Sequence, residues 1–328
     1  MPRYAVACCM RNEAIFLLEW LAYQFAVGFD LVVVVTNDCT DGTDDILDVL
    51  AAADDRIVHL RNQIAPGEAP QVAGMRLVLA DPRVQATDYL LHCDADEFLH
   101  VSVGAGRVAD LMRTLVPGLQ NPPDCIALAW RPFGDAGNLR WNGGSVIAAC
   151  PMADNRPRKA TALHKSLFRP DRFTRAIDHM PKDPVTQTVS VINTAGQPLD
   201  PSPFWRAKNA RYTGLDDTLI TWQNACIHHY AIRSQDVFLM KNDRGDGMGL
   251  SSRKYFINSV FWTRYNRNAT EVPEARQHLP VVLRIMSELR AVRPVARLER
   301  AALASFTTRR DALLTPQQIA DWTEAVPT

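Results

Sequence analysis

The first hundred residues alternate between short β-prone runs and stretches with apolar residues at helical spacing. LVVVVT, at residues 31–36, is a continuous β-branched run, which is typical of a strand buried on both faces of a parallel sheet. The stretch before it has helical spacing and stops at Gly28. Such alternation predicts an α/β fold, a doubly wound, mostly parallel sheet flanked by helices, whose ligands bind beyond the carboxyl ends of the strands. The predicted strands span residues 4–9, 31–36, 56–62 and 88–94, and the predicted helices span residues 11–27, 41–53 and 72–82.

Polar clusters follow three of these strands, at residues 11–13, 36–38 and 94–96. In the last, Asp94 and Asp96 are separated by one small alanine, and Glu97 follows. Two carboxylates that project from one strand end suit a hard divalent cation such as Mg2+ or Mn2+, which keeps open positions for substrate phosphates. The alternative is a solvated acidic loop after a strand. The pattern favours a metal and diphosphate site.

A second set of candidate ligands lies at the end of a strand pattern around residues 221–232, where His228 and His229 are adjacent. Neighbouring strand residues point to opposite faces, so only one of the two histidines can face the site. Imidazole suits Mn2+ better than Mg2+. Lys241 and Arg244 follow in an expected Gly-rich loop and are candidates for binding phosphate oxygens, with ordinary surface bases as the alternative.

Four stretches together carry a family resemblance: RNEA at residues 11–14, TNDCTDGT at 36–43, DADEF at 94–98 and HHYAIRSQDVFLMKNDRG at 228–245. Their order and spacing resemble the glycosyltransferase family 2-like proteins of the GT-A fold, over about three quarters of the chain. The resemblance implies a nucleotide-sugar donor, with Asp94 and Asp96 in the place of the DxD motif and His229 completing the metal site. It also implies that Asn12 and Glu13 lie near the nucleotide.

The resemblance is imperfect at the end of the second strand. Thr36 stands where the family has its first Asp, a residue that often accepts a hydrogen bond from the nucleotide base. Asn37 is the expected substitute for that contact, with Asp38 as a neighbouring contributor. We therefore expect a uridine diphosphate donor.

Family resemblance also favours inversion at the anomeric carbon, which needs a base for the acceptor hydroxyl. We expect Asp135, in the loop FGDAG, to be that base; the alternatives are Glu97, Asp178 and the Asp216–Asp217 pair. Lys165 is interpreted as a surface lysine, or alternatively as a partner of an anionic substrate group. Four aromatic residues of the presumed acceptor half are expected in the core or stacked on sugar rings: Trp130, Phe133, Trp141 and Trp205.

The composition bounds the remaining expectations. Thirty-six basic residues balance thirty-six acidic ones, so no global field favours nucleic acid or an anionic membrane. The chain shows no signal peptide or membrane-spanning run, and its seven cysteines lack zinc-type spacing, so a cytoplasmic protein with reduced thiols is expected.

The residue composition and the pattern of predicted elements change near residue 117 and again near 246. We expect a nucleotide-sugar-binding half at 1–116, an acceptor-binding and site-completing half of the same domain at 117–245, and a helical C-terminal extension at 246–328. Residues 284–310 contain seven arginines and two glutamates, a local excess of positive charge. This excess suggests a peripheral membrane contact near a glycan or lipid-linked acceptor; a solvated helix face or an oligomer contact is the alternative.

Two other functions share these features. A nucleotidyltransferase also binds metal through carboxylates, but the chain lacks a Gly-rich phosphate loop after the first strand. A non-catalytic nucleotide-binding relative is the third hypothesis, because Thr36 departs from the family pattern.

Overall fold

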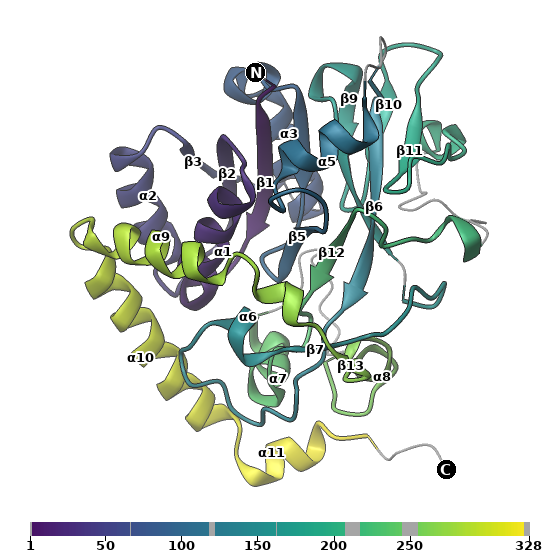
Figure 1. Cartoon of the computed structure of the whole chain (residues 1–328). Helices are drawn as coiled ribbons and strands as arrows, with labels where there is room; N and C mark the ends of the chain where they lie inside the picture. The colour runs from purple at the N-terminus through teal and green to yellow at the C-terminus, as the bar shows by residue number, and fades with distance from the viewer. Residues whose placement is uncertain are drawn as a thin grey trace.

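A mixed nine-stranded sheet forms the centre of the molecule, in the order β3-β2-β1-β4-β8-β6-β12-β5, with β11 paired to β6. The computed structural model describes residues 2–65, 67–117, 122–161, 163–206, 217–244 and 255–324. Helices cover the sheet, as Figure 1 shows. The predicted α/β class, with a mostly parallel sheet flanked by helices, is therefore confirmed.

The first four strands of the chain are parallel to one another, in the order β3-β2-β1-β4. All six residues of β2 are buried because helices pack on both of its faces. Successive residues of a strand point to opposite faces. Accordingly Val6 packs in the core under α1, whereas Ala5 packs in the second core beside α3. The elements of this part are β1 (Tyr4–Met10), α1 (Ala14–Val27), β2 (Leu31–Thr36), α2 (Thr43–Ala53), β3 (Ile57–Arg61), α3 (Pro70–Ala80), α4 (Pro82–Gln85) and β4 (Tyr89–His92).

Later segments of the chain complete the same sheet. Strand β8 inserts between β4 and β6, antiparallel to both. Strand β12 is parallel to β6 and antiparallel to β5, so a strand from residues 1–116 ends the sheet beside strands from 117–245. These elements are β5 (Glu97–Val101), α5 (Val108–Leu115), β6 (Cys125–Pro132), α6 (Val146–Ala149), β7 (Met152–Ala153), β8 (His164–Phe168), η1 (Pro170–Arg172), β9 (Phe173–Ala176), β10 (Pro181–Pro184), β11 (Val191–Asn193), η2 (Ser202–Trp205), η3 (Asp217–Leu219) and β12 (Ala225–His229).

The remaining helices fold back along the molecule. Helices α9 and α10 pack against α1, and α10 also contacts α2, so the C-terminal extension lies on the part formed by residues 1–116 (Figure 1). These elements are α7 (Gln235–Arg244), α8 (Val260–Tyr265), β13 (Thr270–Glu271), η4 (Pro273–Arg276), α9 (Leu279–Ala291), α10 (Val295–Leu313) and α11 (Pro316–Asp321). No helix among the described residues is long and apolar enough to cross a membrane.

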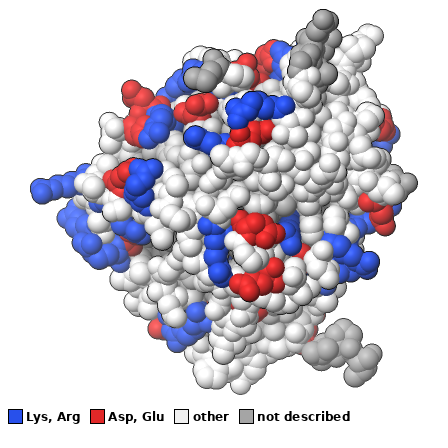
Figure 2. Space-filling model, in the orientation of Figure 1, with Lys and Arg blue, Asp and Glu red and all other residues white. Residues whose placement is uncertain are grey.

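Among the described residues, most arginines of residues 284–310 form ion pairs within the chain. Four of the seven form ion pairs, which join Arg284 to Glu288, Arg290 to Glu299, Arg309 to Asp243 and Arg310 to Asp236. Figure 2 shows acidic and basic side chains interspersed on one face, with basic groups gathered at the edge formed by α9 and α10. The membrane contact predicted for this segment stays a prediction.

Candidate active site

A cavity of about 530 Å³ opens at the carboxyl ends of β1, β2, β4, β6 and β12. Parallel strands bring their carboxyl ends to the same edge of a sheet, which is why residues far apart in the sequence meet here. The lining includes the polar residues Arg11, Asn37 and Asp38, the carboxylates Asp94 and Asp96, and an aromatic wall. The wall contains Trp130, His179, His229, Tyr255, Phe261 and Tyr265.

The acidic turn at residues 94–96 connects β4 to β5 and is held in place by neighbouring groups. The backbone N–H of Asp94 donates to Glu97 Oε2 at 2.8 Å, and the indole N–H of Trp20 donates to the Asp94 carbonyl at 3.2 Å. Glu97 is fully buried and does not line the cavity. Glu97 was one of the alternative bases in the sequence analysis. In the structure it lies beneath the turn and not in the cavity.

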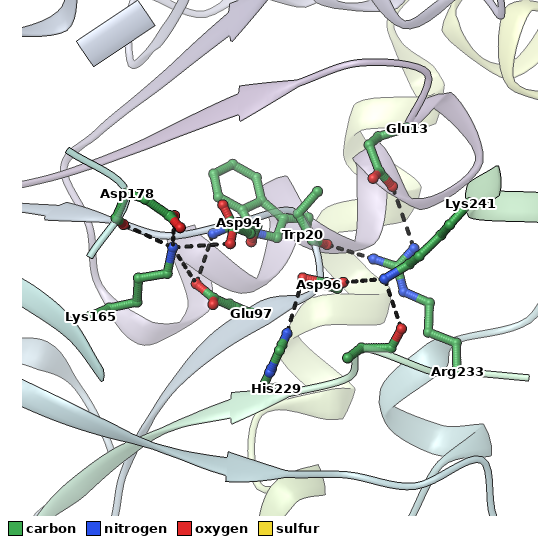
Figure 3. Close-up of polar contacts among 12 residues, drawn as sticks. Glu13, Trp20, Asp94, Asp96, Glu97, Lys165, Asp178, His229, Arg233 and Lys241 are labelled. Carbon is green, nitrogen blue, oxygen red and sulfur yellow. Dashed lines mark hydrogen bonds and ion pairs between the residues drawn. The ribbon is translucent and has the colours of Figure 1, made fainter. Parts of the chain in front are cut away.

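Lys165 is the cation beneath this turn. Its Nζ donates to Asp94 Oδ2 and to Asp178 Oδ1, each at 3.0 Å, and lies 3.4 Å from Glu97 Oε2 (Figure 3). Burial alone would lower the pKa of Lys165, but the charges of Asp178, Asp94 and Glu97 outweigh it and raise the pKa well above its usual value. The expectation of a surface lysine is wrong, because β8 carries this side chain into the sheet next to β4, where it is fully buried.

Asp96 faces Lys241 and the ring of His229. Its Oδ2 accepts a hydrogen bond from Lys241 Nζ at 2.8 Å, and its Oδ1 lies 3.6 Å from His229 Nε2. Burial raises the pKa of Asp96, but the interactions with Lys241, the His229 ring and Arg233 outweigh it and lower the pKa below its usual range. Lys241 lies on α7, and so the expected loop position was wrong. Arg244 ends this helix, and its side chain lies outside the part of the structure that is described.

Arg233 is a residue of this site that sequence reasoning missed. Its guanidinium stacks on the Phe16 ring at 3.7 Å and donates to the Ala95 carbonyl at 2.8 Å. It also lies 3.4 Å from Glu13 Oε2 (Figure 3). It is almost fully buried. The available signal was its position shortly after the strand that carries His229, at the same edge of the sheet as the acidic turn.

The fit of a divalent cation rests on Asp96 and His229. Both oxygens of Asp94 are engaged, one by Lys165 and the other by Gln71 Nε2 at 3.0 Å. Within the described residues no group of three or more His, Cys, Asp or Glu side chains is placed to hold a metal ion. The expected set of Asp94, Asp96 and His229 is therefore not assembled. One carboxylate and one imidazole remain, a donor pair that suits Mn2+ when phosphate and water oxygens supply the other positions.

The two adjacent histidines point to opposite faces of the sheet. His229 lines the cavity and contacts the Trp130 ring at a centroid distance of 4.0 Å. His228 stacks on His100 at 4.4 Å on the other face. Of the two candidates, the structure thus brings only His229 to the site.

The residues expected near the nucleotide line two different cavities. Asn37 and Asp38 line the cavity, and Asn37 Nδ2 donates to Asp38 Oδ2 at 3.2 Å. Asn12 accepts the Thr40 N–H at 2.7 Å and lines a smaller neighbouring cavity instead. The Thr36 hydroxyl is hydrogen-bonded with the His59 ring at 2.8 Å, and Thr36 does not line the cavity.

The acceptor-side candidates are also separated by the structure. Asp135 does not line the cavity; it accepts the Gly137 N–H at 3.0 Å and the Asn268 amide at 3.2 Å, and so shapes its own loop.

Asp178 does line the cavity, and His179 Nε2 lies 3.1 Å from its carboxylate. Burial raises the pKa of Asp178, but Lys165 and His179 outweigh it and lower the pKa well below its usual value. Asp217 is exposed, and Asp216 lies outside the described residues.

The aromatic candidates lie in three different places. Trp130 lines the cavity, while Phe133 and Trp141 are buried in the core. Trp205 is 45% exposed and lines a separate cavity. Of these four residues, only Trp130 lines this cavity.

Comparison with known proteins gives one relative by sequence. No family model matches the chain. A glycosyltransferase family 92 protein of Oryza sativa subsp. japonica is 26% identical over 176 residues, which cover 52% of this chain and 28% of the relative. The chain thus spans less than a third of the length of the curated relative it matches.

Solved structures give weaker matches. The mannosyltransferase PcManGT of Pyrobaculum calidifontis, in complex with GDP-Man and Mn2+, is 12% identical with a TM-score of 0.31, covering 97% of this chain and 78% of that one. The mannosyltransferase Ktr4p of S. cerevisiae is 9% identical with a TM-score of 0.25, covering 41% of each chain. Scores this low carry no argument, so this chain's likeness to a glycosyltransferase rests on the rice protein.

Proposed function

We propose that the chain is a glycosyltransferase that moves a sugar from a nucleotide-sugar donor, expected to be UDP-linked, to a hydroxyl acceptor with inversion. The observation that carries the proposal is the convergence of the acidic turn, Lys241 and an aromatic wall on one cavity at the carboxyl edge of the sheet. The buried Arg233 guanidinium supports the turn from behind, where it donates to the Ala95 carbonyl. The similarity to the rice glycosyltransferase supports it.

The charge balance of the site supports a divalent cation as cofactor. In the lining of the cavity the carboxylates outnumber the basic side chains: the basic ones are Arg11 and Lys241, and the carboxylates are Glu13, Asp38, Glu68, Asp94, Asp96 and Asp178. An anionic diphosphate is repelled by the remaining negative charge unless a cation accompanies it. Asp96 and His229 are the residues that would hold Mn2+, or Mg2+ less favourably. The cation would neutralise charge that develops on the leaving diphosphate.

The residues of the chain have separate tasks in the proposed reaction. Lys241 and Arg233 contribute positive charge on the α7 side of Asp96, where a diphosphate would lie. Asn37 and Asp38 form the nucleoside end, where an amide can pair with uracil. Trp130 and Tyr265 supply aromatic faces for the transferred sugar or the acceptor.

Asp178 replaces Asp135 as the proposed base. Its carboxylate is ionised at neutral pH because its pKa is lowered, and it reaches the cavity with 26% of its side chain exposed. In the proposed step the acceptor oxygen attacks the anomeric carbon, its proton passes to Asp178, and the bond to the diphosphate oxygen breaks. A lipid-linked acceptor and membrane contact remain predictions.

The test is thermal unfolding of the full chain with Mn2+, with each of several nucleoside diphosphates, and with both. At 100 times its dissociation constant a ligand stabilises by about 2.7 kcal/mol. We expect a shift for UDP that needs Mn2+, disappears in Asp96→Asn and persists in Asp55→Asn, an exposed carboxylate away from the cavity. A screen of sugars linked to the nucleoside diphosphate that binds then measures sugar transfer to acceptors.

Two results would count against the proposal. Release of pyrophosphate from a nucleoside triphosphate would indicate nucleotidyl transfer. Binding of UDP without turnover of any UDP-sugar, across a panel of glycan acceptors, would indicate the non-catalytic relative.

A further inference from the structure

Helix α7 carries Lys241 into the candidate site, so the position of this helix decides where the ammonium lies. Lys241 Nζ donates to the Ala231 carbonyl at 2.7 Å and to Asp96 Oδ2 at 2.8 Å. These contacts fix the tip of the side chain. The helix itself is held by two ion pairs from α10, one near each end.

The first ion pair is buried at the start of α7. Arg310 Nη1 lies 3.1 Å from Asp236 Oδ2 and also donates to the Trp141 carbonyl at 3.2 Å. Asp236 in turn accepts the Val237 N–H at 2.7 Å, so one carboxylate joins the first turn of α7 to α10. Both charged side chains are less than a tenth exposed. Breaking a buried pair by removing one partner is strongly unfavourable, which makes this a firm attachment.

The second ion pair lies two residues beyond Lys241. Arg309 binds Asp243 in a two-pronged manner, with Nε at 2.6 Å from Oδ2 and Nη2 at 3.0 Å from Oδ1. A guanidinium that makes two parallel contacts fixes direction as well as distance. Adjacent arginines of α10 therefore hold both ends of the helix that carries Lys241.

Packing alone does not hold α7 against α1. A cavity of about 90 Å³ separates α1, α7 and α10, and its lining includes Phe16, Met240, Lys241, Phe306 and Arg309. Across an incompletely filled space, van der Waals contact resists a small shift of the helix only weakly. The ion pairs then carry more of the positional constraint.

We propose that Arg309 and Arg310 are positioning residues that set Lys241 against Asp96 through α7, so that the arginine-rich C-terminal extension acts as a brace of the active site. The inference rests on the proposed function for its consequence in catalysis. Its structural part, the placement of Lys241, is independent of which reaction the site performs.

The experiment exploits the exposed pair, whose exchange does not threaten folding. Arg309→Glu sets two carboxylates against each other, and Arg309→Glu with Asp243→Arg restores an ion pair of reversed polarity. Arg300→Glu is the matched control, because Arg300 is an exposed residue of the same helix with no ion pair among the described residues. Arg310→Lys probes the buried pair while keeping its charge.

Two readouts are measured on each full-length variant. Lysine acetylation followed by peptide mass spectrometry reports the exposure of Lys241, with exposed Lys159 as the internal reference. Steady-state kinetics report kcat and the KM for the donor. Because misplacement of a catalytic group by an ångström can cost up to about a hundredfold, we expect Arg309→Glu to lower kcat about tenfold and to raise Lys241 labelling several-fold. The double variant should recover both, and Arg300→Glu should change neither.

Each outcome separates the two proposals. Wild-type protein that transfers no sugar overturns the proposed function, while the labelling experiment still decides whether α10 positions Lys241. Equal Lys241 labelling in wild type, Arg309→Glu and Arg310→Lys overturns the brace. So does a loss of activity in Arg309→Glu that the reversed ion pair fails to restore.

Discussion

The Nζ of Lys165 lies 3.0 Å from a carboxylate oxygen of Asp94, although 71 positions separate the two residues in the chain. The contact joins β8 to the acidic turn after β4, and the same ammonium reaches Asp178, which also lines the cavity. One buried charge therefore links the two halves of the candidate site.

Replacing Lys165 by Met should destabilise the fold by about 3–5 kcal/mol, because three carboxylates lose their buried counter-charge. Urea unfolding measures the loss. Lys182→Met is a matched control: Lys182 is equally buried, its Nζ donates to the Pro203 and Arg206 carbonyls, and burial lowers its pKa to about 8. We expect a smaller loss there, and equal losses would contradict the role assigned to Lys165.

The assignment of the base predicts different losses for two aspartates. Asp178→Asn should lower kcat by about 10²–10⁴-fold, the usual contribution of a general base, while UDP and Mn2+ still raise the unfolding temperature. Asp135→Asn should leave kcat within a few-fold because, among the described residues, its carboxylate binds its own loop and Asn268 and does not line the cavity. If the Asp135 variant shows the larger loss at unchanged stability, the sequence-based assignment is restored.

Buried neutral histidines predict acid sensitivity of the fold. Burial lowers the pKa of His92 and of His229 to about 3 and that of His100 to about 4. The unfolded chain takes up these protons below about pH 6.5, whereas the folded chain does not until near pH 4, so the free energy of unfolding falls as the pH drops through this window.

His100 offers the cleanest variant for this effect, because it lies on the sheet face opposite the cavity, stacked on His228. Each such histidine contributes a slope of up to about 1.4 kcal/mol per pH unit. His100→Gln should therefore show a shallower fall in the free energy of unfolding between pH 6.5 and pH 4 than wild type. Parallel curves would show that His100 is protonated in the folded protein.

Gly74 predicts a packing conflict at the back of the cavity. A Cβ at this position of α3 would lie 2.5 Å from Cys9 Sγ and 3.3 Å from Val35 Cγ1. Gly74→Ala should destabilise by about 1–3 kcal/mol despite the better helix propensity of alanine. Cys9→Ala removes the sulfur, so the double variant should be more stable than Gly74→Ala alone, as thermal unfolding would show. An additive pair of effects would rule out this contact as the cause.

The local order of the sequence predicted much of the structure of residues 1–116. Strand β2 occupies residues 31–36 as expected, because a continuous β-branched run carries its own burial signal. Helix α1 ends at Gly28, whose φ of 100° suits a residue without a Cβ. The acidic turn was found because parallel strands present their carboxyl ends at one edge, so position in the pattern already implies position in space.

Tertiary structure alone decided how the site is completed. The insertion of β8 between β4 and β6 turned an apparent surface lysine into the buried partner of Asp94, and the same pairing brought Asp178 to the cavity in place of Asp135. Strand pairing between distant segments and the docking of α10 on α7 are not encoded in any local pattern. Residue periodicity determines which faces are buried, whereas the choice of partner across the sheet depends on the free energy of the whole packed chain.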